Sequence, residues 1–500
     1  MGMHTDSAIP LRMRVAAFAV LLALVFASYG FAARCAFISL DDSSHVTANE
    51  MVQRGLTADG VAQAFRESHA SLYIPLSWLG HMAMSSMFGM DAAAHHLLNV
   101  AIHALNACLL LGALFALTRD WRPSFAVAVL FAVHPINVES VVWVAELKNV
   151  LSTTFWLLAM LAYAIYSRTT KLKWLGAAWL AMLIGCLAKP MLVTLPCALL
   201  LLDGWPLGRW RKGNIARLFA EKIPFVLLSV LFSIAASRAA ADKALSYETL
   251  TLGTRLASAA VGWSNTVGHL FVPMDFAVIY PVPVPFSIPV FISALVLLAS
   301  ALGLALLVWR RAPWVTMGIF WFTGILVPVA GIVQVGSQSM ADRFAYIPQI
   351  GIWCAVVWSA RALLPAWRGW PAVLTVVAVS LAVLCHFQTR NWRDSITLFE
   401  SSIHATDRNY VLHQFCGYEY FRQGRYREAA HHLREYTKIL PRNAEVLTFL
   451  GDSLAASGEP IAAIKSYDDA LSVAPDFLQA KASRQRLIDW IAAKAAAEKK

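Results

Sequence analysis

Charged side chains are scarce in this 500-residue chain. Asp, Glu, Lys and Arg together make up 14% of it, whereas 58% of the residues are hydrophobic. A soluble domain carries about 25% charged residues, so the shortage excludes an ordinary soluble protein. Many apolar runs approach the roughly 20 residues that cross a bilayer core about 30 Å thick. The composition therefore predicts an integral membrane protein in contact with membrane lipid.

Several familiar signatures are also missing. The chain has no GxxxxGK[ST] loop, no GxSxG turn and no CxxC pair, which argues against soluble nucleotide chemistry. Seven cysteines are present, but most lie in apolar segments and only Cys35 and Cys416 are expected to face water. No disulfide framework is predicted. From residue 389 onward, 16 Lys or Arg stand against 14 Asp or Glu, so no nucleic-acid partner is expected.

Eleven apolar segments are predicted to span the membrane. The N-terminal run, which follows Arg12 and Arg14, is too long for a signal-peptide core and is interpreted as an uncleaved first span. Clusters of Lys and Arg between the spans are expected to face the cytoplasm. This orientation places the N-terminus in the cytoplasm. The predicted spans lie near residues 14–34, 94–117, 124–145, 150–166, 174–188, 190–203, 223–239, 287–309, 314–334, 345–364 and 371–388.

Successive spans must alternate between the two sides of the membrane, and eleven spans satisfy this only if residues 255–273 do not cross it. The Ser, Asn and His side chains of this segment favour an interfacial or re-entrant helix. Five segments are then predicted to face the outside together, and the polar residues of any site should come from them. They are residues 35–91, 134–149, 240–286, 335–344 and the tail from 389.

The tail contains a 34-residue period, in which small residues and a proline recur at matching positions. Such spacing is typical of tetratricopeptide repeats, in which small residues let two helices of a hairpin approach closely. We therefore expect an all-α protein with a membrane domain at 1–388 and an outer repeat α-solenoid at 389–500. The repeats would bind a peptide or protein partner, and a purely structural appendage is the alternative. The recurring residues are Gly417, Gly424, Ala429 and Pro441, followed by Gly451, Gly458, Ala463 and Pro475.

Two adjacent carboxylates, Asp41 and Asp42, follow the first span. Like charges side by side cost free energy unless a cation, a base role or water compensates. They are candidate catalytic residues, and a solvated loop start is the alternative. Downstream, His95 and His103 share one face of a predicted span. Interhelical hydrogen bonding is favoured for His103, whereas His95 and its neighbour His96 are better site candidates.

Residues 131–152 combine several charges with a helix breaker. Pro135 after His134 should interrupt the helix. Glu139 and Glu146 are seven residues apart and would share one face of a continuous helix, and Lys148 follows. Such a set suits a polar cavity, and an outer loop with snorkelling side chains is the alternative.

Two more cations belong to the same predicted outer side. Arg343, near Tyr346, has a planar fork suited to phosphate. Lys189 lies between two short spans, where simple snorkelling is the alternative. Two cations facing paired acids predict a site that handles both a phosphate leaving group and a proton. A divalent cation between carboxylate and phosphate is possible but not required, and the identity of any metal is not predicted.

Seven segments in a fixed order resemble bacterial relatives of the transmembrane and tetratricopeptide-repeat O-mannosyltransferases. They are LDDSSHVTANEMVQRGLT, HHLLNVAIHALN, HPINVESVVWVAELKNVLS, LAKPMLVTLP, LLDGWPLGR, MADRFAYIPQIG and RNWRDSITLFE. The resemblance covers nearly the whole chain. It implies the GT-C class of multispan glycosyltransferases and an outward-facing site on a bacterial inner membrane. Polyprenyl-phosphate sugars would be the donor substrates, without a certain cofactor.

The resemblance also implies site roles. Asp41 and Asp42 match the acidic position of the first outer loop, which acts as base or organises the site. Five further residues match family motif positions: His134, Glu139, Glu146, Arg343 and Tyr346. The chain departs from the family at Ile74, where relatives often carry an imidazole, and at Leu147 and Asn149, where they often carry Arg and Asp.

Three functions are compatible with these residues. The leading hypothesis is an inverting transfer of a sugar, with mannose as one candidate, to Ser or Thr hydroxyls of exported protein. A second is transfer to a glycolipid or cell-envelope glycan. A third, motivated by the departures, is a non-catalytic membrane scaffold that recruits partners through its repeats.

Overall fold

The computed structural model describes residues 10–244, 251–282, 287–332, 338–365 and 368–497. Parts of two predicted outer segments, 240–286 and 335–344, therefore lie outside the described residues. The chain divides into two compact units. The first contains residues 1–276 and 282–393, and the second contains residues 277–281 and 394–500.

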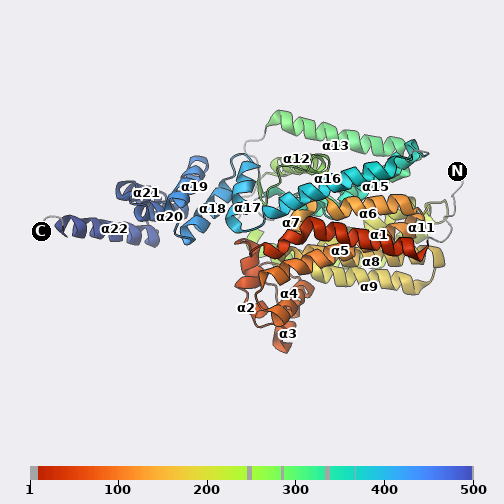
Figure 1. The fold of residues 1–500 in the computed structure, drawn as a ribbon, viewed down its shortest axis with the longest axis horizontal. Helices are drawn as coiled ribbons and strands as arrows, with labels where there is room; N and C mark the ends of the chain where they lie inside the picture. The colour runs from red at the N-terminus through yellow and green to blue at the C-terminus, as the bar shows by residue number, and fades with distance from the viewer. Residues whose placement is uncertain (1–9, 245–250, 283–286, 333–337, 366–367, 498–500) are drawn as a thin grey trace. The chain divides into compact units, whose positions relative to one another are not determined.

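The first unit is built almost entirely from helices. Its long N-terminal helices begin with α1 and α5, and α1, α5, α6, α8 and α9 lie side by side (Figure 1). The helices up to α9 are α1 (Leu11–Tyr29), α2 (Glu50–Gln53), α3 (Ala58–Arg66), α4 (Pro75–Phe88), α5 (Ala92–Thr118), α6 (Trp121–Val133), α7 (Val138–Val142), α8 (Leu147–Thr169) and α9 (Leu172–Ala188). The rest of the unit comprises α10 (Leu195–Gly204), α11 (Ile215–Ala244), α12 (Leu252–Phe271), α13 (Ile288–Val308), α14 (Pro313–Leu326), the short strand β2 (Gln338–Met340), α15 (Gln349–Leu363) and α16 (Trp370–Arg390).

Six segments of the described chain are long and apolar enough to cross a membrane, or up to seven if one bent helix pair counts as a span. They coincide with six of the predicted spans. Four other predicted spans correspond to apolar helices of only 10–17 residues, so the count of eleven is not confirmed. The six segments are Leu11–Arg34, Ala92–Thr118, Val144–Thr169, Ile215–Ala239, Ile288–Val308 and Trp370–Arg390.

The break predicted at His134–Pro135 is confirmed. Helix α6 ends at Val133, and the chain continues at an angle of 55°. A second break follows at Trp143, whose backbone is extended between α7 and a short 3-10 turn. The condition under which Glu139 and Glu146 would share one helix face is therefore not met, because the backbone leaves the helical path between them.

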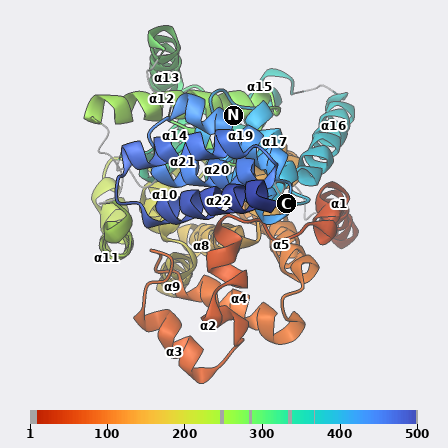
Figure 2. The ribbon, with the colours of Figure 1, turned by 90° about the vertical axis from the view of Figure 1, so that its left-hand side faces the viewer.

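The loop between α1 and α5 folds into a small helical subdomain, visible around α2, α3 and α4 in Figure 2. Asn49 caps α2 and Thr57 caps α3 through side-chain oxygens that accept backbone N–H bonds. Pro75 starts α4 at a position where its missing N–H costs nothing. Its core includes Trp78, which packs with Val144 from the broken-helix segment.

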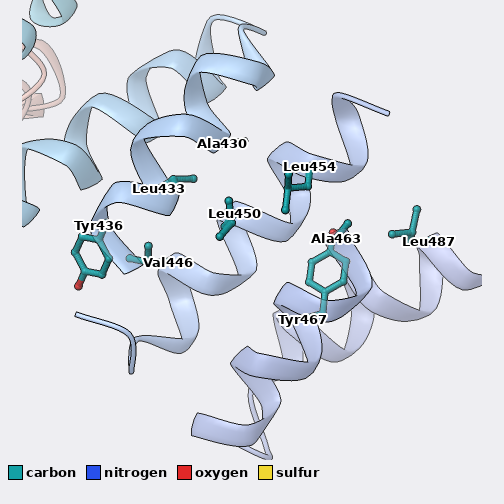
Figure 3. Packing of buried hydrophobic residues seen from close by; sticks show 9 residues of the cluster. All are labelled: Ala430, Leu433, Tyr436, Val446, Leu450, Leu454, Ala463, Tyr467 and Leu487. Carbon is teal, nitrogen blue, oxygen red and sulfur yellow. The ribbon is translucent and has the colours of Figure 1, made fainter. Parts of the chain in front are cut away.

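The second unit contains the short strand β1 and a run of helices that pack in sequence. Each first helix of a pair meets the next at a glycine: Gly417 faces Leu433, and Gly451 faces Tyr467. Figure 3 shows part of its apolar core, formed by Ala430, Leu433, Tyr436, Val446, Leu450, Leu454, Ala463, Tyr467 and Leu487. Its elements are β1 (Tyr280–Pro281), α17 (Ser395–His404), α18 (Tyr410–Arg422), α19 (Tyr426–Ile439), α20 (Ala444–Ala456), α21 (Pro460–Val473) and α22 (Leu478–Ala497).

The expectation that Cys35 and Cys416 face water is wrong. Both side chains are buried, whereas Cys197 is the exposed one. Cys35 directly follows the 3-10 turn Gly30–Arg34 and lies against Thr389 at the end of α16, and Cys416 lies on the inner face of α18. None of the seven cysteines, all of them in the described residues, forms a disulfide bond.

Candidate active site

The centre of the candidate site is Arg343, which bridges two glutamates. Its guanidinium Nη1 donates to Glu139, and its backbone N–H donates to the same carboxylate at 2.7 Å. Its Nε lies 3.6 Å from Glu146. The ring of Trp143 lies 5.2 Å from the guanidinium carbon, a cation–π distance. Arg343 therefore joins both carboxylates of the broken-helix segment.

Two lysines complete the charged cluster. Lys148 lies 3.0 Å from Glu146 and also donates to the carbonyl of Ala145 at 2.9 Å. Lys189 lies 3.2 Å from the other Glu146 oxygen and donates to Asn149 Oδ1 at 3.1 Å. Three cationic side chains thus surround two carboxylates.

The helix breaks explain why these charges meet. Glu139 lies in the first turn of the short α7, and Glu146 directly precedes α8. A carboxylate at a helix N-terminus interacts favourably with the helix dipole. Lys189 follows the last residue of α9, a helix that packs along α8. Ends of separate helices, rather than one continuous face, therefore assemble the cluster.

The two adjacent aspartates have different environments. Asp42 is fully buried, and its two carboxylate oxygens accept backbone N–H bonds from Ile38 and Ala145, each at 2.8 Å. Asp41 is exposed. Burial raises the pKa of Asp42 to about 7, although the two N–H bonds counteract it. Asp42 acts as a clamp between the loop and the charged segment, whereas the side chain of Asp41 is not buried in that contact.

Asp41 is within electrostatic range of the cluster. Burial lowers the pKa of Arg343, but the charges of Glu139 and Glu146, with a smaller contribution from Asp41, raise it above its usual value. Burial also lowers the pKa of Lys189, and the charge of Glu146 offsets only part of that effect. Arg343 is the permanent cation of the site.

A shallow depression, with essentially no enclosed space for a water molecule, lies beside the cluster. Of the predicted residues, Lys189 and Arg343 line it. The other lining residues are Asn149, Met191, Phe344, Ile347 and Pro348. Two cations, one amide and apolar side chains therefore meet at this place.

The other predicted residues contact backbone or interior groups instead of this depression. His95 Nε2 is 3.2 Å from the carbonyl of Gly89. His134 Nε2 is 3.1 Å from the carbonyl of Leu270. The Tyr346 hydroxyl is 2.6 Å from His103 Nδ1. His103 Nε2 is 3.0 Å from the carbonyl of Ala132 in α6, which confirms interhelical hydrogen bonding of His103. These side chains hold helices together around the site.

Three polar residues that the sequence did not single out as ligands support the cluster. Asn149, noted only as a departure from the family, donates to the Arg343 carbonyl at 3.0 Å and to Ser140 at 2.8 Å. Gln338 accepts a 3.3 Å bond from Arg343 Nη2. Asn149 could have been found from its position one turn after Glu146, whereas Gln338 and Ser140 carry no distinctive sequence signal.

Another ion pair includes the residue that precedes Arg343 in the sequence. His269 Nδ1 is 2.7 Å from Asp342, the residue before Arg343. Burial lowers the pKa of His269, but the hydrogen bond and charge of Asp342 outweigh it and leave the pKa raised. The pair ties α12 to the segment that carries Arg343.

The described residues around Arg343 contain no group of three His, Cys, Asp or Glu ligand atoms with metal-site spacing. The carboxylates of Glu139 and Glu146 are paired with cations. A divalent cation here would have to displace the Lys and Arg side chains from these carboxylates. The divalent cation at the site therefore remains a prediction.

Comparison with known proteins gives distant relatives. No protein-family model matches the chain. It is 23% identical to human protein O-mannosyl-transferase TMTC1 over 451 residues, which is 78% of this chain and 50% of that protein. It is 30% identical to mouse protein O-mannosyl-transferase TMTC3 over 152 residues, 29% of this chain and 16% of that protein. Mouse protein O-mannosyl-transferase TMTC2 is 32% identical over 102 residues.

The chain is therefore distantly related to proteins named protein O-mannosyl-transferase. It spans half or less of the length of the relatives it matches. The relation agrees with the family resemblance of the motifs and with a membrane protein, since apolar helices dominate the first unit.

Proposed function

We propose that this protein is a GT-C glycosyltransferase of the bacterial inner membrane. It would transfer a sugar, with mannose as the candidate taken from the relatives' names, from a polyprenyl-phosphate donor to hydroxyl groups of exported protein. The observation that carries the proposal is the clamp by Asp42. It attaches the loop bearing Asp41 to the segment that carries the charged cluster.

The proposed reaction is a single displacement with inversion. The acceptor hydroxyl oxygen attacks the anomeric carbon, and the bond from that carbon to the phosphate oxygen breaks. Asp41 accepts the hydroxyl proton, which contributes about 10²–10⁴ in rate. The phosphate keeps the electron pair of the broken bond, and Arg343 and Lys189 stabilise it through charge-assisted hydrogen bonds. No metal is required for this balance.

The proposed topology has eleven spans, a cytoplasmic N-terminus and a periplasmic second unit. In this proposal, residues 389–500 form a tetratricopeptide-repeat solenoid that presents the acceptor protein. The close helix approaches at Gly417 and Gly451 support the repeat assignment.

The test is transfer of labelled sugar from polyprenyl phosphate in proteoliposomes that contain the whole chain. Asp41→Asn should reduce turnover by about 10²–10⁴-fold with unchanged unfolding temperature. Asp59→Asn removes another exposed carboxylate of the same loop and should leave turnover unchanged. Full activity of Asp41→Asn would eliminate the proposed base, and absence of transfer by the unaltered protein would overturn the proposal.

A non-catalytic scaffold is the second candidate, and one observation favours it. Leu147 and Asn149 remove a cation and a carboxylate from the family motif, and Leu147 is buried against Gly80 of α4. The scaffold predicts that Asp41→Asn and Arg343→Lys leave the cellular function intact while bulky substitutions at Gly417 abolish it.

The acceptor decides between the two transferase variants. A comparison of glycoproteins with lipid-linked envelope glycans, in cells with and without the gene, distinguishes protein from glycolipid or glycan as acceptor.

A further inference from the structure

The second unit contains a group of ligand atoms that the proposed transfer reaction does not use. A carboxylate oxygen of Glu400, the Sγ of Cys416 and a ring nitrogen of His432 all lie within 4.8 Å of one another. The three residues come from consecutive helices, α17, α18 and α19. A thiol, an imidazole and a carboxylate are the ligand types that zinc sites use.

A further imidazole lies beside His432, outside the group of three. His413, one turn before Cys416 on α18, has its Nδ1 3.1 Å from Nδ1 of His432. Two nitrogens bound to one tetrahedral zinc at about 2.0–2.1 Å would be about 3.3–3.4 Å apart. The observed separation needs only a small adjustment. Without a metal, the same contact is a hydrogen bond in which only one of the two facing nitrogens carries a proton.

The environment of Cys416 suits a ligand of a structural metal. Its side chain is fully buried, so a metal bound there would be shielded from water. A thiol that coordinates a metal is deprotonated, and the neutral imidazole is the form of histidine that binds metals.

Neighbouring side chains orient two of the ligands. The Tyr420 hydroxyl donates to the Glu400 carboxylate, and the Tyr420 ring stacks on His432 with centroids 5.5 Å apart. Ligands held in this way are typical of metal sites, where outer-shell partners fix the ring and the carboxylate.

We propose that Glu400, Cys416 and His432 hold a zinc-like divalent cation, and that the His413 side chain moves in as the fourth ligand when the cation binds. Four protein ligands would then close the coordination sphere, which is the arrangement of structural rather than catalytic zinc. The cation would clamp α17 to the helix pair α18–α19. Such a clamp would stabilise a short helical array, since repeat arrays bury their core only through neighbouring repeats. This site is independent of the proposed transfer reaction.

The experiment uses the purified full chain in detergent, stripped with a chelator and reloaded with Zn²⁺ or Co²⁺ alone. We expect one tightly held zinc per chain and a rise in the unfolding temperature of the second unit. Co²⁺ should produce the charge-transfer absorption of a thiolate ligand. Cys416→Ser should abolish that absorption, and Tyr420→Phe should weaken metal affinity by about 10–100-fold.

Two variants serve as matched controls. His404→Gln changes an exposed histidine of α17, and Cys197→Ser changes the exposed cysteine. Neither should alter metal affinity or the thiolate absorption.

Three results would overturn the site: no retained zinc, a thiolate absorption that persists in Cys416→Ser, or zinc binding unchanged in both Glu400→Gln and His432→Gln. If circular dichroism shows that Cys416→Ser does not fold, Glu400→Gln decides the question. Glu400 is only partly buried, so its amide variant should fold and lose affinity.

Discussion

Asp42 Oδ1 accepts a 2.8 Å hydrogen bond from the backbone N–H of Ala145, 103 residues later in the chain. The other oxygen accepts from Ile38. The carboxylate therefore accepts hydrogen bonds from two backbone N–H groups. One lies in the first loop and the other lies at the break before α8. This bond ties the loop that contains the exposed Asp41 to the segment that contains Glu146.

Loss of the clamp should lower stability. Asp42→Asn supplies one carbonyl oxygen and one N–H₂ group, so one backbone N–H would face a donor and lose its partner. We expect a decrease of about 1–3 kcal/mol in the free energy of unfolding, measured by thermal unfolding in detergent. Asp41→Asn should unfold at the temperature of the unaltered protein. Equal stability of both variants would contradict the clamp.

The same carboxyl should make stability depend on pH. Its pKa is about 7 in the folded protein and 3.8 in the reference state, so the folded protein holds the proton more tightly. Stability from this group is therefore greatest near pH 4, falls as the pH rises towards 7, and is constant above that. The difference in unfolding temperature between the unaltered protein and Asp42→Asn, measured from pH 4 to 8, should have this slope. A difference that does not change with pH would contradict it.

The His269–Asp342 pair should have its own pH dependence. The pKa of His269 is raised above 6.5 in the folded protein. The stability that the pair contributes is present below pH 6.5 and is lost as the pH rises through the folded pKa. His269→Gln should therefore flatten the decline of unfolding temperature on the alkaline side of pH 6.5. An unchanged profile would mean that the 2.7 Å contact does not involve a charged imidazole.

Arg343 should be needed for both folding and donor binding, and two variants separate these roles. Arg343→Met leaves Glu139 and Glu146 without one cation, and breaking such a buried pair costs about 3–5 kcal/mol. Adding Glu139→Gln should restore much of that stability because it removes the unpaired charge. The double variant should still fail to bind polyprenyl phosphate. Recovery of both stability and donor binding would show that Arg343 has only a structural role.

Gly451 tests the packing of the second unit. A methyl group there would collide with the ring of Tyr467, which is buried and fixed by a 2.8 Å bond to Asp452. Gly451→Ala should destabilise the unit by about 1–3 kcal/mol, even though alanine is the better helix former. Gly112→Ala, in a helical position with open space, is the control and should be neutral or slightly stabilising. An equal effect of both changes would contradict the close helix approach.

Local patterns along the chain were sufficient for much of the fold. Long apolar runs predicted eleven spans, and six of them coincide with segments of spanning length in the described chain, because length and apolar composition are local properties. Pro135 predicted a break, because a proline removes a backbone donor wherever it stands. His103 was correctly expected to bond between helices, because a polar side chain in an apolar span needs a partner. Four other predicted spans correspond to apolar helices of only 10–17 residues. Their lengths were not predicted, since hydropathy does not reveal where a helix ends.

The sequence by itself determined which charged residues lie near the predicted helix break and in the segments between spans, since residue type and proline position can be read directly from it. Only the tertiary structure decided which of two adjacent aspartates is the clamp, because the backbone of Ala145 meets one of them and not the other. It also decided that Arg343 joins Glu139 and Glu146 although Trp143 interrupts the helix between them. Partner choice across 200 residues depends on how helices pack, and no short stretch of sequence encodes that geometry.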